Sequence, residues 1–498
     1  MNYSELIVFI IYLMCMLGIG VVFFINAKGK EGEKGYFLGN RKMGPWVSAL
    51  SAGASDMSAW VLMGLPASIY AYGMGQTWIA IGLAIGYILS WLFMAPRLRK
   101  FSIAANDSIT IPQYLTNRFL SKSKALQIVC AIIFLVAYTV YAASSIKACG
   151  ILFNTVLGID ANLAMYIAGF VIIGYTLMGG FQAVCWTDFF QGLLMLGALL
   201  VAPIFALVLV ESGHTEAISV SFPENYWNFL SSGKWDWKSW ADILTGLGWG
   251  LGYFGMPHII IRFMAIRSQK DVRKGAKIGI TWNILILIFS VAAGCIGRMF
   301  LGDVDSSGKE IVSATVFIQM VRLIFPGVIA GILLSAILAA AMSTADSQLL
   351  ASASAFAADV YKPVLRKGQA VDEEMFWAGR FVVAIIALIA VIIASNPGSG
   401  TIMSLVGNAW GVFGAAFGPA ILLSLFWKRF TFIGAVTGIV AGAAVDVIWI
   451  VAFSSTGLYE IIPGFIVGLI AAIIVTLCGK KPGAEVEALY DKSVAVED

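Results

Sequence analysis

The stretch Ala49–Leu65 reads ALSAGASDMSAWVLMGL and decides the fold. It lies inside a long apolar segment, yet it contains Ser51, Ser55 and Asp56. A carboxylate at mid-bilayer depth costs about 2.5–3.5 kcal/mol on insertion scales unless it meets a partner or a cavity. Irregular backbone at that depth is tolerated only where it lines a cavity or is buried in protein. We interpret the stretch as a transmembrane helix broken at a binding site. The alternative is a helix-packing contact in which Asp56 pairs with a buried Arg or Lys.

The composition identifies a polytopic membrane protein. Of 498 residues, 60% are hydrophobic and only 12% are charged, whereas soluble domains carry about 25% charged residues. Met1–Glu5 lacks the basic region of a cleavable signal peptide, so we expect the first apolar run to stay in the protein as a membrane span. The small net charge of +4 does not favour nucleic-acid binding. The six Cys are scattered without a CxxC or Cys/His cluster, so they favour neither a disulfide framework nor a metal site.

The hydrophobic pattern predicts an all-α protein with about 13 apolar segments of spanning length. Basic clusters follow alternate segments. When each segment is counted as one crossing of the membrane, all of these clusters fall on the same side. The positive-inside rule then makes that side cytoplasmic, with the N-terminus outside and the C-terminus inside. The clusters on that side include Lys28, Lys30, Lys34, Arg41, Lys42, Arg97, Arg99, Lys100, Arg262, Arg267, Lys270, Arg273, Lys274, Lys428, Arg429, Lys480 and Lys481.

Two of these segments, Pro45–Tyr72 and Ile243–Met264, are interrupted by glycines, the first also by polar residues. They lie five spans apart, and an odd offset gives two halves of opposite topology. Interrupted segments at corresponding positions of inverted halves point to a transporter's midplane site. Close helix packing is the alternative reason for the glycines. The predicted units are 1–43, an extra helix and inner loop; 44–212, the first repeat; 213–240, an outer loop; 241–430, the second repeat; 431–479, two extra helices; and 480–498, a cytoplasmic tail.

The ninth segment supplies a candidate cation site. On a helix the hydroxyls of Ser343 and Thr344 lie beside the carbonyl of Ala340. Two carbonyls from the broken second segment, near Ala54 and Met57, would complete a small set of oxygen ligands. Hard cations take such ligands, and unwound backbone carbonyls suit Na⁺. The alternative is that both hydroxyls bond only to their own helix.

Two further acids lie in apolar surroundings. Asp188 begins the sixth segment, where an acid favoured by the helix dipole is the simplest interpretation. A second cation site or a part of the inner gate is the functional alternative. Asp346 lies one turn beyond Ser343 and would face the same inner cavity. His258 is interpreted as a hydrogen-bonding residue and not as a metal ligand.

Aromatic residues on the seventh segment suggest a substrate pocket. Trp249, Tyr253 and Pro257 recur at a spacing of four and therefore share one helix face. With Trp60 and Tyr141 they would form an apolar box with polar tips, suited to a small ring or aliphatic chain. Packing is the alternative, but the flanking glycines favour an opened backbone. The motifs of P-loop, Rossmann and common hydrolytic enzymes are absent from the sequence, so an enzyme is not expected and an ion gradient would drive transport.

These residues fall in motifs that resemble the solute:sodium symporter family, and within it the bacterial sodium/proline symporters. The matching strings extend over nearly the whole chain and are SAGASDMS (Ser51–Ser58), GLPA (Gly64–Ala67), CWTD (Cys185–Asp188), GWGLGYFG (Gly248–Gly255), PHI and RFMA (Pro257–Ala265), AGILLSAILAA and MST (Ala330–Thr344), GAAFGP (Gly414–Pro419) and GLYEIIPGF (Gly457–Phe465).

The resemblance implies a leucine-transporter-type 5+5 inverted-repeat core, with one extra helix before it and two after it. It assigns sodium to the backbone oxygens of Ala54, Met57 and Ala340 with the Ser343 and Thr344 hydroxyls. Asp56 would couple sodium to transport, and Asp188 would belong to a second sodium site or the inner path. The implied substrate contacts are Ser58, Trp60, Tyr141, Trp249, Tyr253 and Pro257.

The chain departs from the resembled pattern at three positions. Ala59 stands where a glycine is frequent and adds a methyl group beside the pocket. Met256 stands where a glutamine can occur. Asp346 stands where an uncharged residue can occur, and its charge would bear on the number of coupling cations or on proton sensitivity. Ala59 and Met256 therefore bear on the substrate range.

We expect sodium-coupled symport of L-proline by alternating access across the bacterial cell membrane, with Na⁺ as coupling ion. Nucleic acid and an obligate protein partner are not expected. A symporter for another amino acid or a carboxylate is the nearest alternative. A sodium-conducting channel or a membrane sensor is a more distant one, and the sequence shows no output domain after Lys481.

Overall fold

The computed structural model describes residues 1–498 except 1–2, 28–32, 179, 218–219, 305–308 and 496–498. The described residues form helices joined by loops, without a named strand. The α-helices are α1 (Tyr3–Ala27), α2 (Glu33–Leu38), α3 (Pro45–Asp56), α4 (Gly64–Tyr72), α5 (Thr77–Leu89), α6 (Ala95–Ala104), α7 (Ile111–Arg118), α8 (Ala125–Leu157), α9 (Ala161–Met178), α10 (Phe181–Glu211), α11 (Trp237–Gly248), α12 (Pro257–Ala265), α13 (Gln269–Leu301), α14 (Val316–Ile324), α15 (Gly327–Ser354), α16 (Asp372–Ser395), α17 (Ile402–Phe426), α18 (Phe432–Ala452), α19 (Ile461–Cys478) and α20 (Ala484–Ala495).

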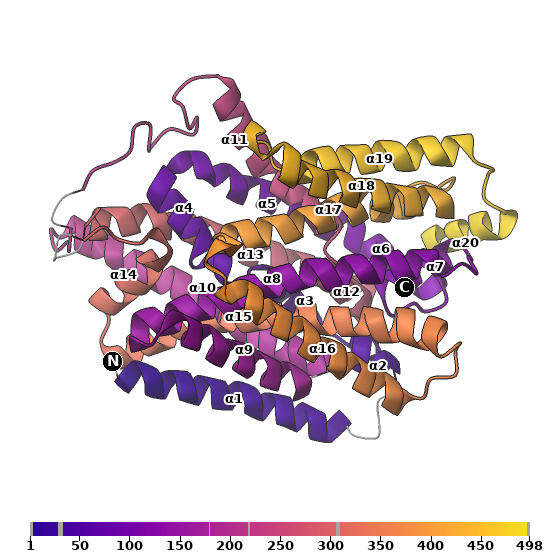
Figure 1. Ribbon diagram of the computed structural model, residues 1–498, viewed down its shortest axis with the longest axis horizontal. Helices are drawn as coiled ribbons and strands as arrows, with labels where there is room; N and C mark the ends of the chain where they lie inside the picture. Colours follow the sequence, from indigo (N-terminus) through magenta and orange to yellow (C-terminus); the bar gives the residue numbers. More distant parts are fainter. Residues whose placement is uncertain (1–2, 28–32, 179, 218–219, 305–308, 496–498) are drawn as a thin grey trace.

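Long helices run side by side along the horizontal axis of Figure 1. Ten of the helices in the described part are long and apolar enough to cross a membrane. The other three expected spans correspond to α9 and to two interrupted segments, α3–α4 and α11–α12. The all-helical membrane architecture is therefore confirmed, whereas the count of 13 spans stays a prediction.

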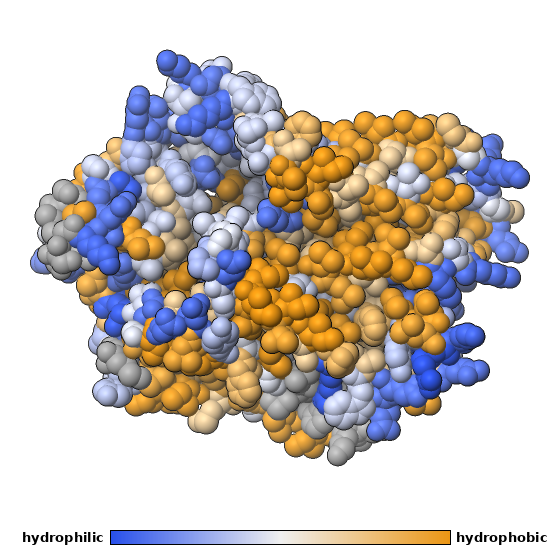
Figure 2. Space-filling view, in the orientation of Figure 1, coloured by the Kyte–Doolittle hydropathy of each residue, from blue (hydrophilic) through white to orange (hydrophobic). Residues whose placement is uncertain are grey.

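The surface carries a broad apolar band. Figure 2 shows hydrophobic side chains covering the face formed by α16 to α19, with hydrophilic residues gathered at the two ends of the molecule. Large apolar side chains are open on several helices, such as Phe170 at 79% and Val451 at 81% exposure. Monomeric soluble proteins rarely expose contiguous apolar patches of this kind. The band therefore marks the surface that lipid covers.

One end of the molecule collects the basic loops between helices. Arg41 bonds Asp107 at 2.9 Å, and Arg99 donates to the carbonyls of Ile266 (2.8 Å) and Arg267 (2.7 Å). Burial opposes ionisation of Asp107, but Lys34 and Arg41 together hold its pKa below the usual range. α1 begins at the opposite end, whereas α20 lies at this end (Figure 1). Lys28 and Lys30 of the predicted cluster lie outside the described residues.

The first interruption separates α3 from α4. Met57 has φ −78° and ψ 40°, so the chain leaves helical geometry directly after Asp56. Ser58 then caps a short 3₁₀ turn, η2 (Ala59–Val61), because its side chain accepts a hydrogen bond from the Trp60 backbone N–H at 3.4 Å. The predicted break in Ala49–Leu65 is present.

The second interruption separates α11 from α12. A 3₁₀ segment, η5 (Trp249–Phe254), follows α11, and Met256 is extended before Pro257 opens α12. The glycines here also permit close packing. A methyl group at Gly252 would lie 1.9 Å from the Trp410 indole nitrogen, and one at Gly255 would lie 2.3 Å from the Phe413 carbonyl oxygen. The interruption and the close packing of glycines therefore occur at the same residues, whereas the midplane site stays a prediction.

The helix α5 packs backbone to backbone against η5. A methyl carbon added at Gly86 would lie 2.2 Å from the Gly250 oxygen, and one at Gly250 would lie 2.3 Å from the Gly82 oxygen. Neither contact can be relieved by moving a side chain, since both partners are backbone atoms. This packing fixes the position of the second interruption.

We predict that Gly86→Ala lowers stability by about 1–3 kcal/mol, the usual effect of overpacking. Gly197 lies in α10 with nothing within 4 Å of an added methyl carbon. Gly197→Ala should therefore be neutral or slightly stabilising, because alanine is the better helix former. Thermal unfolding midpoints of both variants in detergent test this. Equal midpoints would contradict the packing argument.

Candidate functional site

The residues predicted to bind sodium meet where α15 crosses the broken helix. The Ser343 hydroxyl donates to the Ala54 carbonyl at 2.9 Å and also lies 3.1 Å from the Ala340 carbonyl. The Thr344 hydroxyl lies 3.5 Å from the same Ala54 oxygen. All four residues are fully buried. The Ser343 hydroxyl therefore bonds both its own helix and α3, and the Thr344 hydroxyl reaches α3. The alternative that both hydroxyls bond only to their own helix is wrong.

Met57, the fifth predicted ligand, is the residue at which α3 ends. It lies three residues after Ala54, where the backbone leaves helical geometry. The donor set consists of carbonyl and hydroxyl oxygens without formal charge. Such a set fits a small hard cation, because Na⁺ is held by unwound backbone carbonyls and hydroxyls in transporters of this architecture.

Asp56 is buried and hydrogen-bonded without a basic partner among the described residues. The Tyr253 hydroxyl donates to Asp56 Oδ2 at 2.6 Å, whereas Oδ1 has no partner. The backbone carbonyl of Asp56 lies 3.4 Å from both the Trp60 indole nitrogen and the Tyr141 hydroxyl. The alternative of a buried ion pair at Asp56 is therefore wrong. The acid instead joins the two interruptions through Tyr253.

The predicted aromatic box is partly assembled. The rings of Trp60 and Trp249 lie 6.3 Å apart, and all five predicted aromatic and proline residues are buried. Two further rings complete the cluster: Tyr459 stacks on Trp249 at 5.1 Å, and Trp410 donates to the Trp249 carbonyl at 2.8 Å. Neither ring is among the contacts predicted from the sequence, because nothing in the chain order places Trp410 or Tyr459 beside Trp249.

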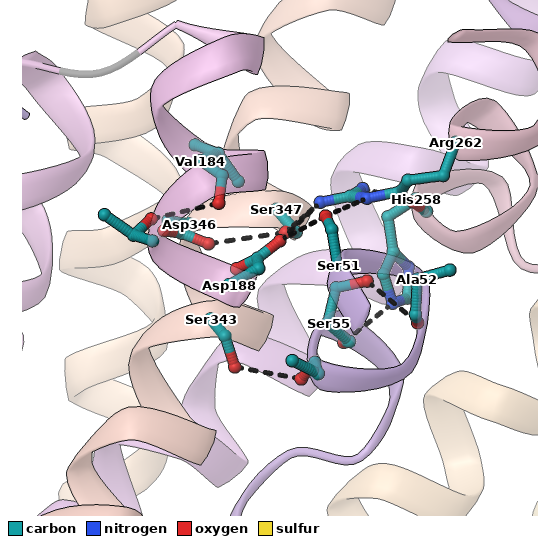
Figure 3. A network of polar contacts seen from close by, with 12 residues as sticks. Ser51, Ala52, Ser55, Val184, Asp188, His258, Arg262, Ser343, Asp346 and Ser347 are labelled. Atoms are coloured by element: carbon teal, nitrogen blue, oxygen red, sulfur yellow. Dashed lines mark hydrogen bonds and ion pairs between the residues drawn. The ribbon is translucent and has the colours of Figure 1, made fainter. Parts of the chain in front are cut away.

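A buried ion pair lies near the contact between Ser343 and α3, and Figure 3 draws it above Ser343. Arg262 reaches Asp188 Oδ2 at 3.1 Å, and the Ser51 hydroxyl donates to the same oxygen at 2.7 Å. Arg262 also donates to the Ser347 hydroxyl at 2.5 Å, and Ser347 lies 3.3 Å from Asp346 Oδ1. The network therefore ties α3, α10, α12 and α15 together.

This network corrects two sequence interpretations. Asp188 is not a helix-start acid, because α10 already begins at Phe181 and Asp188 is fully buried. Arg262 does not belong with the exposed basic residues that follow it, since it is 2% exposed. A charge count along the sequence cannot separate a buried arginine from a loop arginine.

His258 is a hydrogen-bonding residue of the interior. Its Nε2 lies 3.2 Å from the Ser55 carbonyl, and its backbone N–H donates to the Tyr138 hydroxyl at 2.9 Å. These contacts match the sequence interpretation and hold the start of α12 against α3 and α8. No group of three or more His, Cys, Asp or Glu side chains suited to a metal ion occurs among the residues that were described.

The family described as "Sodium:solute symporter family" matches residues 36–442. The chain belongs to the sodium:solute symporter family. Curated relatives cover almost all of it. The osmoregulated proline transporter OpuE of Bacillus subtilis is 44% identical, with 95% of this chain and 94% of the relative covered. A sodium/proline symporter of Staphylococcus aureus is 40% identical, with 99% and 96% covered.

A solved structure of another protein has the same architecture as this chain. A Na⁺-coupled sialic acid symporter in a substrate-bound outward-open state aligns with a TM-score of 0.79 at 20% identity, covering 96% of this chain and 99% of that chain. The leucine-transporter-type fold implied by the sequence motifs is thereby confirmed. The chain is a multi-pass membrane transporter and not an enzyme.

We predict that Arg262→Met lowers stability by about 3–5 kcal/mol, because it leaves the Asp188 charge buried without its partner. Adding Asp188→Asn to that variant should restore much of the loss. Arg366→Met is the matched control, since Arg366 and Glu374 form an exposed pair that contributes about 0–1 kcal/mol. Chemical unfolding in detergent measures the stability of the three variants and shows whether the losses follow this order. A loss in Arg262→Met no larger than in Arg366→Met would refute it.

Proposed function

We propose that this chain is a sodium-coupled secondary active transporter that carries L-proline into the cell by alternating access. The names of the relatives supply the substrate. The observation that carries the mechanism is the 2.9 Å contact between Ser343 and the Ala54 carbonyl. It joins a continuous helix of the proposed second repeat, 241–430, to the broken helix of the first, 44–212.

Sodium acts through the oxygen cluster at this contact. The ion would be held by the carbonyls of Ala54, Met57 and Ala340 and the hydroxyls of Ser343 and Thr344. Its binding draws α15 and the end of α3 together, which steadies the η2 turn. By linkage, proline must tighten sodium binding by the same factor by which sodium tightens proline binding.

Proline binds at the two interruptions. Its carboxylate would meet backbone N–H groups of the η2 turn, near Ser58 and Ala59. Its ring would lie against Trp60, Trp249 and Tyr141. Pro257 and Tyr253 then complete the wall on the α12 side. Backbone N–H groups at broken helices bind anionic substrate groups in transporters of this kind.

The buried acids have separate roles in this proposal. Asp56 couples the sodium cluster to the pocket, because Tyr253 bonds its carboxylate while Trp60 and Tyr141 approach its carbonyl. The ion pair with Arg262 favours the inner gate for Asp188 over a second sodium site. Asp346 influences this gate through Ser347.

We propose that the end with the basic loops and α20 is cytoplasmic and that α1 begins outside. The gathering of basic loops at one end supports this orientation. An impermeant thiol reagent should reach Cys478, an exposed residue at the end of α19, only from the inside.

We predict that Ser343→Ala and Thr344→Ala each raise the sodium concentration for half-maximal proline uptake about tenfold, a change of about 1.4 kcal/mol. Each removes one oxygen ligand from the cluster. Ser335→Ala is the control, because that buried hydroxyl bonds only the Gly331 carbonyl of its own helix at 2.8 Å. An unchanged sodium dependence in both variants would remove the site assignment.

We predict that Asp56→Asn reduces sodium-stimulated uptake more than it reduces the amount of folded protein. The amide keeps the shape but removes the negative charge beside the sodium cluster. Uptake rates divided by protein amount, at several sodium concentrations, test this. Wild-type kinetics would show that the charge is not needed.

The decisive experiment measures labelled proline uptake by the purified protein in proteoliposomes. An imposed sodium gradient should drive accumulation, and a potassium gradient should not. Competition with a panel of amino acids and carboxylates then tests the substrate. Sodium-driven uptake of another solute, with proline ineffective, would replace proline and keep the symport. Sodium current without a solute would indicate a channel.

A further inference from the structure

Two acids that belong to neither proposed ligand set meet between α17, α18 and α19. Asp446 lies in α18, and Glu460 directly precedes α19. Both approach Gly411 of α17: a methyl carbon added there would lie 2.8 Å from Asp446 Oδ1 and 3.1 Å from Glu460 Cγ. Only a glycine leaves room for both carboxylates at this crossing.

The two acids differ in their access to water. Asp446 has no exposed surface, and neither of its carboxylate oxygens has a hydrogen-bond partner. Glu460 is partly exposed and directly precedes α19, at the end of that helix farther from α20. The Asn408 amide, oriented by its hydrogen-bond partners, donates to Glu460 Oε1 at 3.2 Å. Glu460 therefore stands between solvent and a sealed, unpartnered carboxyl group.

No basic side chain neutralises this pair among the described residues. The elements packed against α18 are α17, α19, α8 and the turn before α19. Apart from the two acids, the titratable group nearest this crossing is Tyr459, whose hydroxyl donates to the Gly407 carbonyl at 2.7 Å. The lysine of α8, Lys147, donates to Ser399 at 3.1 Å and to the Gly400 carbonyl instead.

The surroundings favour a proton over a metal cation. Small residues line the crossing: added methyl carbons at Gly442 and Gly464 would lie 2.2 Å from the Ala415 oxygen and 2.7 Å from the Ala415 side chain. This packing leaves few oxygens besides the two carboxylates, whereas a hard cation takes a larger set of oxygen ligands. Two neighbouring carboxyl groups in a low-dielectric site cannot both ionise at small cost.

We propose that Asp446 and Glu460 form a proton-binding pair that holds one proton and exchanges it with solvent through Glu460. The pair lies next to the proposed proline pocket, because Tyr459 precedes Glu460 and its ring stacks on that of Trp249 at 5.1 Å. Loss of the proton places a second charge at the α17–α18–α19 crossing and loosens the packing of Tyr459 on Trp249. Uptake thereby becomes sensitive to the pH of the solution that contacts Glu460.

The test is infrared spectroscopy of the purified, substrate-free protein, so its result is independent of the proposed function. A protonated buried carboxyl group gives a C=O band distinct from carboxylates. The band should be present at neutral pH and be lost in Asp446→Asn. Asp491→Asn is the control, because Asp491 is a tail acid 60% exposed beside Lys428. It should leave the band unchanged.

Glu460→Gln provides a second measurement if Asp446→Asn folds poorly. Without the anionic neighbour, Asp446 ionises more easily. As the pH is raised, its band should therefore disappear at a pH about one unit or more lower than in the unchanged protein. The pH dependence of uptake should shift in the same direction. A band that Asp446→Asn leaves intact, or a titration that Glu460→Gln does not move, overturns the proposal. A carboxylate-only spectrum that changes on adding Na⁺ or K⁺ also overturns it and indicates a cation site.

Discussion

The structure depends on satisfying the backbone groups that are released where α3 stops at Asp56. In the interior of a membrane protein there is no bulk water to take up such groups, so other side chains must do so. The Ala54 carbonyl receives Ser343 from α15, and the Asp56 carbonyl is approached by Tyr141 from α8. A local break is thus held by residues nearly a hundred to nearly three hundred positions away. The second interruption is bound to the first by Tyr253.

Much of this arrangement could be predicted, because polar residues inside apolar segments stand out. Asp56, Ser343 and Thr344 were identified by their presence at a depth where polarity is expensive. The break follows from the same signal, whereas the helical membrane architecture follows from the length and spacing of the apolar segments.

What the sequence could not supply were partners that carry no unusual feature of their own. Trp410 is one aromatic residue in an apolar helix, and only the fold places its indole on the Trp249 carbonyl. Arg262 resembles its basic neighbours in sequence, but α12 carries it into the interior toward Asp188. The sequence places the start of this segment at Asp188, about two turns too late, because a single acid interrupts the apolar run, whereas α10 begins at Phe181.

The strengths of the buried contacts match what a symporter has to do. A buried ion pair such as Asp188–Arg262 is expensive to separate, since breaking one by removing a partner costs about 3–5 kcal/mol. A neutral hydrogen bond contributes only about 0.5–1.5 kcal/mol net. The contact between Ser343 and Ala54 is of the second kind, so it can open and close in each cycle. A ligand shifts such an equilibrium only by its difference in affinity for the two states. In the proposed mechanism one alkali ion held by several oxygens decides a contact of this weak kind and leaves the ion pair intact. This is the physical reason for assigning sodium to the contact between Ser343 and Ala54 and not to the Asp188–Arg262 pair.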